Sequence, residues 1–449
     1  MDLDIFIPEN VRAVIHSLEN AGFEAYIVGG CVRDSFMGRI PNDYDVCTNA
    51  KPDEVKAALS GFKTIDTGIK HGTVTVMSDN EPVEVTTYRI DGEYSDHRKP
   101  DSVEFTDQLT DDLSRRDFTI NAMAYSDKMG VVDVFNGQKH LFNRKIRCVG
   151  EPEKRFEEDA LRILRALRFA SELEFVLDKD TDSAVHRCRK LLRDVSEERI
   201  SAELNRLLLG ENVYDVLMKY HDVIEVFIPE ITPCVGFNQQ SRYHLYDVWE
   251  HTAMSVSQAK KDLTIRLAML LHDISKPDCF KLDDNGQGHF YEHEQLGAEV
   301  AEKILRRLKY PNSVIEDVVT LIRYHYVTPV DDERVIKRLM SKIGSPAFHR
   351  LMEVQKADSR AKQPFCMERV PLIDKINFKA YEIEKRGDCI SLKDLAVNGN
   401  DIMELGYSGK TVGDILDELL QAVISDEISN DRDVLISKAK QIGDKINEQ

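Results

Sequence analysis

The chain has 449 residues and a net charge of −19, with 42% hydrophobic and 31% charged residues. This length favours two to four folded domains, and the apolar content excludes a disordered chain. The acidic balance argues against a surface broadly coated with basic residues for nonspecific nucleic-acid binding. Residues 139–206 carry 16 Lys and Arg against 14 Asp and Glu, so a polyanion would make its contacts there.

The sequence gives no sign of a membrane or secreted protein. It contains no run of about 18 apolar residues, and its first residues include Asp2, Asp4 and Glu9. The eight cysteines are scattered without the paired spacing of zinc sites or disulfide scaffolds. We therefore expect a cytoplasmic protein that does not contact a membrane.

The first 140 residues are predicted to form a small α/β domain. Helical patterns cover residues 7–21 and 52–59. Short β-branched or alternating runs bounded by Gly, Pro and Asp predict strands at residues 24–28, 73–77, 83–87 and 103–106. The polar stretch at residues 90–101 lies between two predicted strands and is expected to be a mobile loop.

After Gly150 the strand signals largely vanish, and apolar residues three and four apart predict helices to the end of the chain. Breaks rich in Pro, Gly and Asp occur near residues 229–240, 281–288 and 363–371. The predicted fold class is therefore α+β. Its domains are a mixed α/β domain at residues 1–140 and helical domains at residues 141–240, 241–365 and 366–449.

Two motifs in the first domain predict a site for nucleotides and metals. Gly29 and Gly30 follow a predicted strand and offer backbone N–H groups to a phosphate, although such a pair alone is more often only a turn. Asp43 and Asp45 are two residues apart on a predicted strand, so both carboxylates should face the same side and share divalent cations. Two Mg²⁺ ions there could activate a hydroxyl and neutralise a triphosphate.

Further residues of this domain extend the predicted site. Glu84, on the strand at residues 83–87, is either a third carboxylate near the metals or a surface glutamate. The segment RRDFTINA, residues 115–122, carries cations, an acid and an amide suited to triphosphate and ribose contacts, or it is the charged start of a helix. The segment DVFNG, residues 133–137, is predicted to be a structural turn.

Taken in order, six segments resemble the motif set of the class II tRNA nucleotidyltransferases, the CCA-adding enzymes: GGCVRD, DYD, RRDFTINAMA, DVFNG, EEDALRILRALRFA and ERISAELNRLLLG. The resemblance implies a head, neck, body and tail, with Mg²⁺ held by Asp43 and Asp45. It further implies nucleotide contacts by Gly29, Gly30, Arg33, Arg116, Asp117 and Asn121. The implied partners are CTP, ATP and the 3′ end and elbow of tRNA, bound by a monomer or a homodimer.

The resemblance assigns the reading of the incoming base to Asp159 and Arg162. Their spacing of three residues on a predicted helix would place both side chains on one face, with Arg165 and Arg168 extending a basic face. An ordinary surface ion pair is the alternative. In the tail, Gly406, Gly409 and Gly413 are expected either to offer N–H groups to tRNA phosphates or to form helix caps and turns.

A second set of residues predicts another metal site. His251, His272, Asp273 and Asp358 supply imidazoles and carboxylates suited to a divalent transition metal or Mg²⁺. His293 and His325 could extend the set to two metals, with Lys276 as a nearby anion contact. The pattern resembles the HD superfamily of metal-dependent phosphohydrolases, which implies a possible phosphohydrolase activity.

Several alternatives remain open at this point. The chain could add only the final A or only the two C residues. In the family that it resembles, a shortened loop marks the enzymes that add only CC, whereas the loop at residues 90–101, with Arg98, is similar to the full-length form. The chain could also be a poly(A) polymerase, a dedicated HD phosphohydrolase or a tRNA-binding module without catalysis. The intact pair Asp43 and Asp45 argues against the last two.

Overall fold

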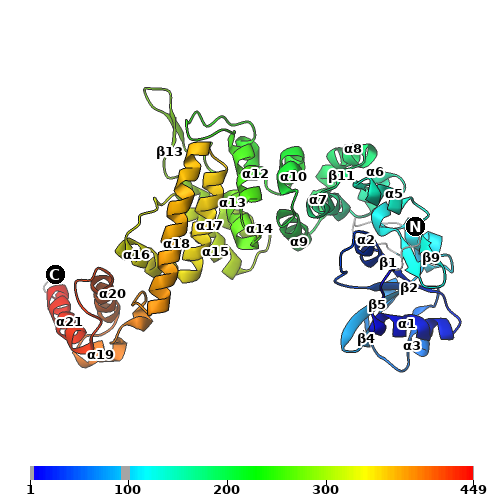
Figure 1. The fold of residues 1–449 in the computed structure, drawn as a ribbon, viewed down its shortest axis with the longest axis horizontal. Helices are drawn as coiled ribbons and strands as arrows, with labels where there is room; N and C mark the ends of the chain where they lie inside the picture. Colours follow the sequence, from blue (N-terminus) through cyan, green and yellow to red (C-terminus); the bar gives the residue numbers. More distant parts are fainter. Residues whose placement is uncertain (1–4, 93–101, 448–449) are drawn as a thin grey trace. The chain divides into compact units, whose positions relative to one another are not determined.

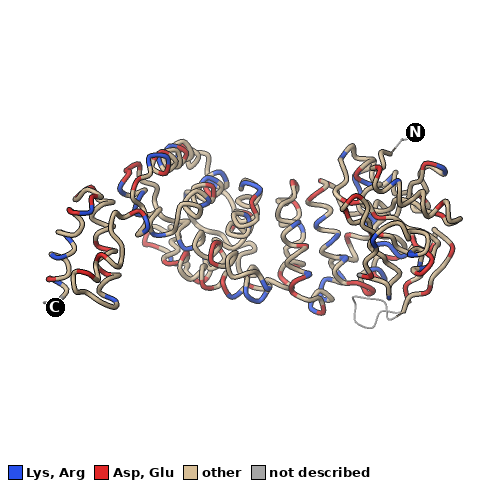
Figure 2. The backbone as a smooth tube through the Cα atoms, turned by 90° about the horizontal axis from the view of Figure 1, so that it is seen from below, with Lys and Arg blue, Asp and Glu red and all other residues tan. Residues whose placement is uncertain are grey.

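The computed structural model describes residues 5–92 and 102–447, which are the coloured parts of Figure 1 and Figure 2. The chain divides into two compact units, Met1–Pro229 and Glu230–Gln449 (Figure 1).

The first unit is built around a mixed seven-stranded sheet, with the strand order β3-β4-β5-β2-β1-β8-β9. Strands β2 and β5 run parallel, and the other neighbouring pairs are antiparallel. The strand bounds are β1 Ala25–Val28, β2 Asp45–Thr48, β3 Lys63–Gly68, β4 Thr73–Ser78, β5 Glu81–Thr87, β8 Ala124–Ser126 and β9 Gly130–Val132. Strand β1, between β2 and β8 inside the sheet, is buried along its whole length, which explains its continuous apolar sequence AYIV.

Helices α1 (Glu9–Asn20) and α3 (Pro52–Ala58) contact this sheet, and α2 (Gly30–Phe36) contacts β1. A separate hairpin joins β6 (Arg89–Asp91) to β7 (Val103–Phe105). The domain continues through α4 (Leu109–Ser114), a 3₁₀ turn η2 (Thr119–Asn121) and α5 (Gly137–Phe142). A short β10 (Lys145–Ile146) then pairs in parallel with β11 (Val176–Leu177).

The prediction of a mixed α/β domain followed by helices is confirmed. The four predicted strands appear as β1, β4, β5 and β7, and the two predicted helices as α1 and α3. The possible helix start at residues 115–122 is wrong, because α4 ends at Ser114 and the segment then forms an irregular turn and η2.

The rest of the first unit is helical. It contains α6 (Pro152–Glu158), α7 (Leu161–Leu173), α8 (Lys179–Cys188), η3 (Arg189–Asp194), α9 (Glu197–Leu208), α10 (Val213–Lys219) and α11 (His221–Ile224). Helix α7 packs against α9, and most of its residues are buried. The prediction that Asp159 and Arg162 lie on one helix is wrong: Asp159 has an extended backbone (φ −139°, ψ 102°) that separates α6 from α7.

The second unit is almost entirely helical. Its larger part contains η4 (Pro229–Cys234), α12 (Val248–Gln258), α13 (Leu263–Leu271), α14 (His293–Arg307), α15 (Asn312–Tyr324), α16 (Glu333–Ile343), α17 (Ser345–Arg360), η5 (Pro364–Glu368) and α18 (Arg369–Arg386), and one hairpin, β12 (Phe280–Leu282) with β13 (Gly288–Phe290). Helices α12, α13 and α15 all contact α17.

The C-terminal part of this unit has its own apolar core. It contains η6 (Leu392–Asp394), α19 (Gly399–Glu404), α20 (Lys410–Ile424) and α21 (Arg432–Asn447). Val397, Ile402, Ile415, Leu419 and Leu435 form the centre of this core. In the described part of the chain, no helix combines the length and the apolar character needed to cross a bilayer.

Candidate nucleotidyl-transfer and metal sites

The predicted glycine turn lies directly after β1 and before α2. Gly29 has a φ of 83°, which L side chains rarely adopt. A Cβ atom on Gly29 would also lie 3.1 Å from the Arg116 guanidinium. The local sequence therefore needs glycine both for the turn and for the close approach of Arg116.

Asp45 and Glu84 are brought together by the parallel pairing of β2 and β5. They are register partners, so their side chains leave the same face of the sheet. Both side chains are exposed, and they line an open pocket of about 200 Å³ together with Arg89, Arg115 and Arg116. Asp45 and Glu84, two of the three carboxylates predicted for the metal site, are therefore adjacent.

Asp43 lies just before β2, so the expectation that both aspartates belong to one strand is wrong. The negative charge of Asp43 nevertheless acts on Asp45. Desolvation by the surrounding protein raises the pKa of Asp45 to about 6, against the opposing effect of Arg116, and Asp43 and Glu84 raise it further. Carboxylates held this close together favour a bound cation.

Asp112 pairs with two arginines of this pocket, Arg115 and Arg116, and the sequence did not predict it as a site residue. Its buried carboxylate lies 2.6 Å from Arg115 Nη2 and 3.2 Å from Arg116 Nη2. Asp112 is three and four residues before these arginines in DDLSRRD, a spacing that could have indicated the contacts. Arg89, also missed, pairs with Asp91 at 2.9 Å.

Asp117 and Asn121 form a buried network with two arginines. Arg165 Nε and Nη2 donate to Asp117 Oδ2 at 2.8 and 2.6 Å, and Asn121 Nδ2 donates to Asp117 Oδ1 at 3.2 Å. Arg33 Nη1 donates to Asn121 Oδ1 at 2.7 Å. Although burial opposes ionisation of Asp117, Arg165 outweighs it, and the pKa falls to about 2. The network connects α2, η2 and α7.

The ring of Phe169 on α7 supports the arginines of this region. The guanidinium carbons of Arg33, Arg165 and Arg168 lie 5.1, 5.6 and 4.1 Å from its centroid. Arg168 also pairs with Glu203 at 3.0 Å. Arg33, Arg165 and Arg168 are therefore packed structural groups as well as predicted nucleotide contacts.

The side chains of the predicted base-reading residues contact different partners on α6, α7 and α9. Asp159 accepts a hydrogen bond from the N–H of Leu161 at 3.1 Å and pairs with Arg199 at 2.8 Å. Arg162 pairs with Glu158 at 2.5 Å and donates to the Arg115 carbonyl at 3.3 Å. The expected single helical face is wrong because the chain breaks between α6 and α7, and the role of the two residues stays a prediction.

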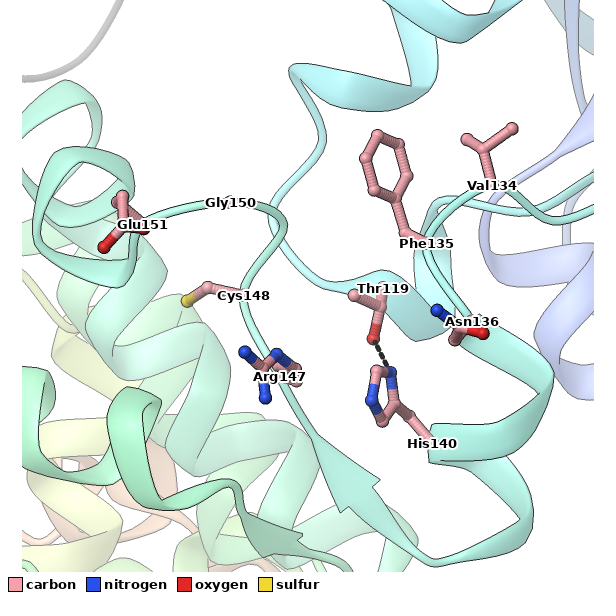
Figure 3. A pocket seen from close by; sticks show the side chains of 9 residues that line it. All are labelled: Thr119, Val134, Phe135, Asn136, His140, Arg147, Cys148, Gly150 and Glu151. Atoms are coloured by element: carbon pink, nitrogen blue, oxygen red, sulfur yellow. Dashed lines mark hydrogen bonds between the residues drawn. The ribbon is translucent and has the colours of Figure 1, made fainter.

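The segment DVFNG forms the predicted turn. Asp133 accepts hydrogen bonds from the N–H groups of Gly137 and Gln138, and Asn136 has the left-handed φ of 59°. A cavity of about 450 Å³ lies beside it, and Figure 3 shows the Thr119 hydroxyl and His140 Nδ1 on one side, 2.9 Å apart.

Arg98 and most of the loop predicted at residues 90–101 lie outside the described residues. In the tail, Gly406 and Gly409 have φ values of 95° and 61°, at the end of α19 and the start of α20, and Gly413 lies within α20. Gly406 and Gly409 thus have the geometry of helix ends, and contacts of the three glycines to tRNA phosphates stay a prediction.

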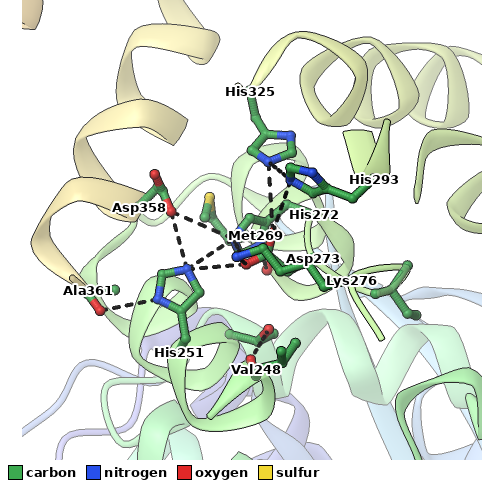
Figure 4. A network of polar contacts seen from close by, with 12 residues as sticks. Val248, His251, Met269, His272, Asp273, Lys276, His293, His325, Asp358 and Ala361 are labelled. Atoms are coloured by element: carbon green, nitrogen blue, oxygen red, sulfur yellow. Dashed lines mark hydrogen bonds and ion pairs between the residues drawn. The ribbon is translucent and has the colours of Figure 1, made fainter. Parts of the chain in front are cut away.

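The predicted second metal site converges on Asp273 (Figure 4). His251 comes from α12 and Asp358 from α17, whereas His272 and His325 follow the last residues of α13 and α15, and His293 begins α14. Two groups of three ligands share Asp273, and the ligand atoms in each lie within 4.8 Å of one another: His251, His272 and Asp273, and Asp273, His293 and His325.

Each oxygen of Asp273 serves one of these groups. Oδ2 lies 3.1 Å from His272 Nε2 and 3.4 Å from His251 Nε2, and Oδ1 lies 3.6 Å from His293 and 3.9 Å from His325. Asp358 Oδ1 adds a carboxylate oxygen 3.2 Å from His251 Nε2. This arrangement suits a carboxylate that bridges two cations.

The four imidazoles are oriented by the backbone. Each Nδ1 lies 2.6–3.1 Å from a carbonyl oxygen, those of Ala361, Met269, Phe290 and Ile322. A proton on Nδ1 leaves the Nε2 lone pair facing the cluster, as in metal-binding histidines. Burial lowers the pKa of His251 and His293, and that of His325 to about 3, so these rings are neutral.

The Nε2 atoms also meet in pairs, His251 with His272 and His293 with His325, each at 3.3 Å. Lys276 lies 2.7 Å from Asp273 Oδ2. Burial opposes ionisation of Asp273, but His272 and Lys276 outweigh it, and its pKa lies well below the ordinary range. The donor set therefore fits divalent cations that accept nitrogen and oxygen ligands.

Comparisons with known proteins agree with this organisation. Residues 25–147 match the poly A polymerase head domain, residues 174–235 the RNA and SrmB-binding site of polymerase A, and residues 292–439 the tRNA nucleotidyltransferase domain 2. Together, these matches and the fold define the class of the protein as a nucleotidyltransferase. Its mixed sheet carries carboxylates beside arginines, and helical domains follow the sheet.

The curated relatives narrow this class. The chain is 34% identical over 441 residues to the CCA-adding enzyme of Ligilactobacillus salivarius, covering 97% of this chain and 98% of the relative. It is 33% identical to that of Geobacillus stearothermophilus, covering 95% of each. The solved Bacillus stearothermophilus CCA-adding enzyme in complex with CTP is 28% identical, with a TM-score of 0.76 over 98% of this chain and 100% of that one. The chain belongs to the family of CCA-adding enzymes.

Proposed function

We propose that this enzyme adds C, C and A to the 3′ end of tRNA, using CTP and ATP without a nucleic-acid template. The observation that carries the proposal is the pocket where Asp45 and Glu84 face Arg115 and Arg116, in a chain that matches CCA-adding enzymes over almost its whole length. The tRNA 3′-hydroxyl oxygen attacks the α-phosphorus of the nucleotide, a phosphodiester bond forms, and pyrophosphate leaves.

Asp43 and Asp45, with Glu84 beside them, would hold Mg²⁺, and their mutual proximity fits such a cation. Two bound Mg²⁺ ions supply charge neutralisation for the triphosphate and activation of the attacking hydroxyl. Arg116, fixed by Asp112, would pair with phosphate oxygens. Gly29 would allow the backbone to approach the triphosphate, and Gly30, Arg33, Asp117 and Asn121 would position the nucleotide.

Base selection follows from hydrogen-bonding chemistry. A carboxylate only accepts and a guanidinium only donates, so Asp159 and Arg162 suit an exocyclic amine beside an unprotonated ring nitrogen. Cytosine and adenine both present this edge, whereas uracil and guanine present a carbonyl beside a ring N–H. The fixed partners of Asp159 and Arg162 in α6 and α9 would hold the two side chains ready for the base.

The proposal is tested with tRNA that lacks its 3′ CCA, incubated with Mg²⁺ and with CTP and ATP separately and together. Complete addition requires C incorporation from CTP alone and A incorporation only after CC. Asp43→Ala and Asp45→Ala should each lower addition by several orders of magnitude and leave tRNA binding intact. Addition within a few-fold of wild type in either variant would refute the assignment.

The same assay separates the alternatives. An enzyme that adds only the last A would extend tRNA ending in CC but not tRNA lacking CCA. A poly(A) polymerase would extend RNA with ATP alone and continue beyond one residue. We expect the protein to act in the cytoplasm, as a monomer or a homodimer.

A second function is favoured by the cluster around Asp273. We propose that His251, His272, Asp273 and Asp358, with His293 and His325, hold one or two divalent cations, either transition metals or Mg²⁺, and hydrolyse a phosphoester. The paired Nε2 atoms at 3.3 Å, each ring oriented through Nδ1, carry this proposal. When bound, the metals would supply Lewis-acid activation of water, which attacks phosphorus while the P–O bond to the leaving oxygen breaks and that oxygen takes a proton.

The test measures metal content and hydrolysis together. Purified protein, reconstituted with Mn²⁺, Ni²⁺, Co²⁺ or Mg²⁺, is analysed by mass spectrometry for bound metal and assayed with bis(4-nitrophenyl) phosphate. We expect bound metal and hydrolysis in the wild type. Protein without bound metal after reconstitution would leave the cluster as a packed polar core and refute the proposal.

A further inference from the structure

The pocket beside Asp45 also contains two threonines on the neighbouring strands. Asp45 on β2 is the register partner of Glu84 on β5, and Thr86, two residues after Glu84, is the register partner of Thr73 on β4. Residues two apart on a strand point to the same face of a sheet. Asp45, Glu84, Thr86 and Thr73 accordingly all line the pocket of about 200 Å³. The pocket therefore extends from the carboxylates to a pair of hydroxyl groups.

The two hydroxyl groups contact each other. Thr73 Oγ1 and Thr86 Oγ1 are 3.1 Å apart, and both residues are partly buried. Each hydroxyl has a single proton, so one hydroxyl donates to the other and the second proton is left for another acceptor. Within residues 5–92 and 102–447, the structure gives neither hydroxyl a second hydrogen bond. The remaining proton can therefore be donated to a ligand oxygen in the pocket.

A guanidinium group lies beside the hydroxyl pair. Arg89 Nη1 donates to the carbonyl of His71, two residues before Thr73, and Arg89 also lines the pocket. Hydroxyl protons and a guanidinium donate hydrogen bonds, and the oxygens of a phosphodiester accept them. This end of the pocket thus suits a phosphate group, whereas the end with Asp45 and Glu84 suits metal ions.

The order of the strands indicates which phosphate this is. The strands β1, β2, β5 and β4 follow one another across the sheet. Gly29 directly follows β1, and a Cβ atom on it would lie 3.1 Å from the Arg116 guanidinium. A triphosphate bound by Gly29 and Arg116 therefore lies on the β1 side of Asp45. Thr86 and Thr73, on β5 and β4, lie on the opposite side of β2.

The chemistry of nucleotide transfer needs both sides of the site. The attacking oxygen and the leaving oxygen lie roughly in line through the phosphorus atom. If the leaving pyrophosphate extends towards Gly29 and Arg116, the attacking 3′-hydroxyl approaches from the side of β5 and β4. The nucleoside that carries this hydroxyl is joined to the rest of the RNA by a phosphodiester. That phosphodiester is the group that would reach the two threonines.

We propose that the hydroxyls of Thr73 and Thr86, together with Arg89, bind the last phosphodiester of the RNA substrate and so place its 3′-hydroxyl beside Asp45 and Glu84. The inference rests on the nucleotide addition proposed above and names residues that hold the RNA end. The alternative is a pair that only stabilises β4 against β5, because threonines opposite each other stabilise antiparallel strands.

The first test removes the hydroxyls and keeps the shape of the side chains. Thr73→Val and Thr86→Val are compared with Thr73→Ser and Thr86→Ser, which retain the hydroxyl. Thr64→Val, at a partly buried threonine of β3 that does not line the pocket, is the matched control. The KM for tRNA lacking CCA, the KM for CTP, the inhibition constant of pyrophosphate and the thermal unfolding midpoint are measured for each protein.

Each Val variant should raise the KM for tRNA about tenfold, as the loss of a hydrogen bond to a charged group implies. The KM for CTP and the inhibition constant of pyrophosphate should stay within twofold of wild type, and the Ser variants and Thr64→Val should match the wild type. A KM for tRNA within twofold of wild type in both Val variants would overturn the proposal. A rise confined to CTP and pyrophosphate would also overturn it, because the hydroxyls would then bind the triphosphate.

The second test changes the RNA instead of the protein. A neutral methylphosphonate replaces the phosphodiester before the 3′-terminal nucleoside of tRNA lacking CCA, and each stereoisomer is assayed. In the wild type this should raise the KM for tRNA about tenfold. In the double variant with Val at both positions it should raise the KM at most about threefold, because only Arg89 then remains to bind the phosphate. Equal effects in the two proteins, or none in the wild type, would overturn the proposal.

The wild-type measurement needs no variant, so it judges the proposal even if a Val variant does not fold. Wild-type protein that adds C from CTP, with variants and modified RNA that behave like the wild type, would leave the proposed function standing and refute this inference. Wild-type protein that adds no nucleotide would refute both, because no RNA 3′ end would then have to lie beside Asp45.

Discussion

Replacing Asp159 by Ala should reduce the use of CTP and ATP and narrow their advantage over UTP and GTP. In the structure the Asp159 side chain is only 17% exposed, and that of Arg162 only 11%. Each would therefore meet a base in a largely desolvated setting. A hydrogen bond to a charged group contributes about 1.5–3 kcal/mol there, which corresponds to a roughly 10- to 150-fold loss of kcat/KM for CTP and ATP.

The contacts of Asp159 supply a matched control. Arg199 is its ion-pair partner at 2.8 Å, and Arg199→Met removes this pair while it leaves the carboxylate and its hydrogen bond from Leu161 in place. If Asp159 reads the base, Asp159→Ala changes the ratios among nucleotides and Arg199→Met changes them less. If Asp159 serves only the ion pair, both variants lower the use of all four nucleotides equally.

The assay measures kcat/KM for CTP, ATP, UTP and GTP separately, with tRNA lacking CCA for the pyrimidines and tRNA ending in CC for the purines. Arg162→Met is tested in the same way, with Glu158→Gln as its control because Glu158 is the carboxylate that pairs with Arg162. Unchanged ratios across the four nucleotides in both Asp159→Ala and Arg162→Met would refute the reasoning.

Three other predictions concern the buried network, the loop and the cluster. Asp117→Asn should destabilise the contact with Arg165 by about 2 kcal/mol, as the fall in the Asp117 pKa from 3.8 to about 2 implies, and hydrogen exchange in η2 and α7 would measure the loss. Because this pKa is depressed, the stabilisation is present above pH 3.8 and disappears as the pH falls through about 2. Hydrogen-exchange rates in η2 and α7 that equal those of the wild type would contradict the prediction. Deleting residues 92–99 should leave tRNA ending in CC, and an equal loss of C addition would show a general role for the loop. His272→Ala combined with Asp273→Ala should remove bound metal and hydrolysis while CTP incorporation continues at the wild-type rate.

The sequence predicts the strands that have a clear pattern and misses those that do not. Strands β4 and β5 alternate or carry β-branched residues, so their period is visible. Strand β8 has only three residues, all buried, and β3 carries the polar sequence KTIDTG at the edge of the sheet. Neither provides a local period, and both form because neighbouring strands complete their hydrogen bonds.

The sequence contained a local signal for the break between α6 and α7, but the helical spacing of the residues around it predicted a continuous helix instead. Asp is one of the residues that cap helix N-termini, and Asp159 accepts from the N–H of Leu161 at the start of α7. The pairing of Asp117 with Arg165, 48 residues apart, had none. Such contacts depend on how the sheet domain packs on α7, which no local pattern contains.

The two candidate metal sites differ in donor atoms and in burial, and both differences indicate that the two sites suit different kinds of cation. Asp45 and Glu84 offer only oxygen from exposed side chains, which suits a hard cation that keeps several waters and enters with a triphosphate. His251, His272 and Asp273 offer mainly imidazole nitrogen, with side chains 0–2% exposed, which suits a cation bound directly by protein. Sequence could identify both donor sets, since each is carried by residue type. That Asp273 serves both histidine pairs, one through each oxygen, depends on five helices meeting at one carboxylate, and only the fold shows it.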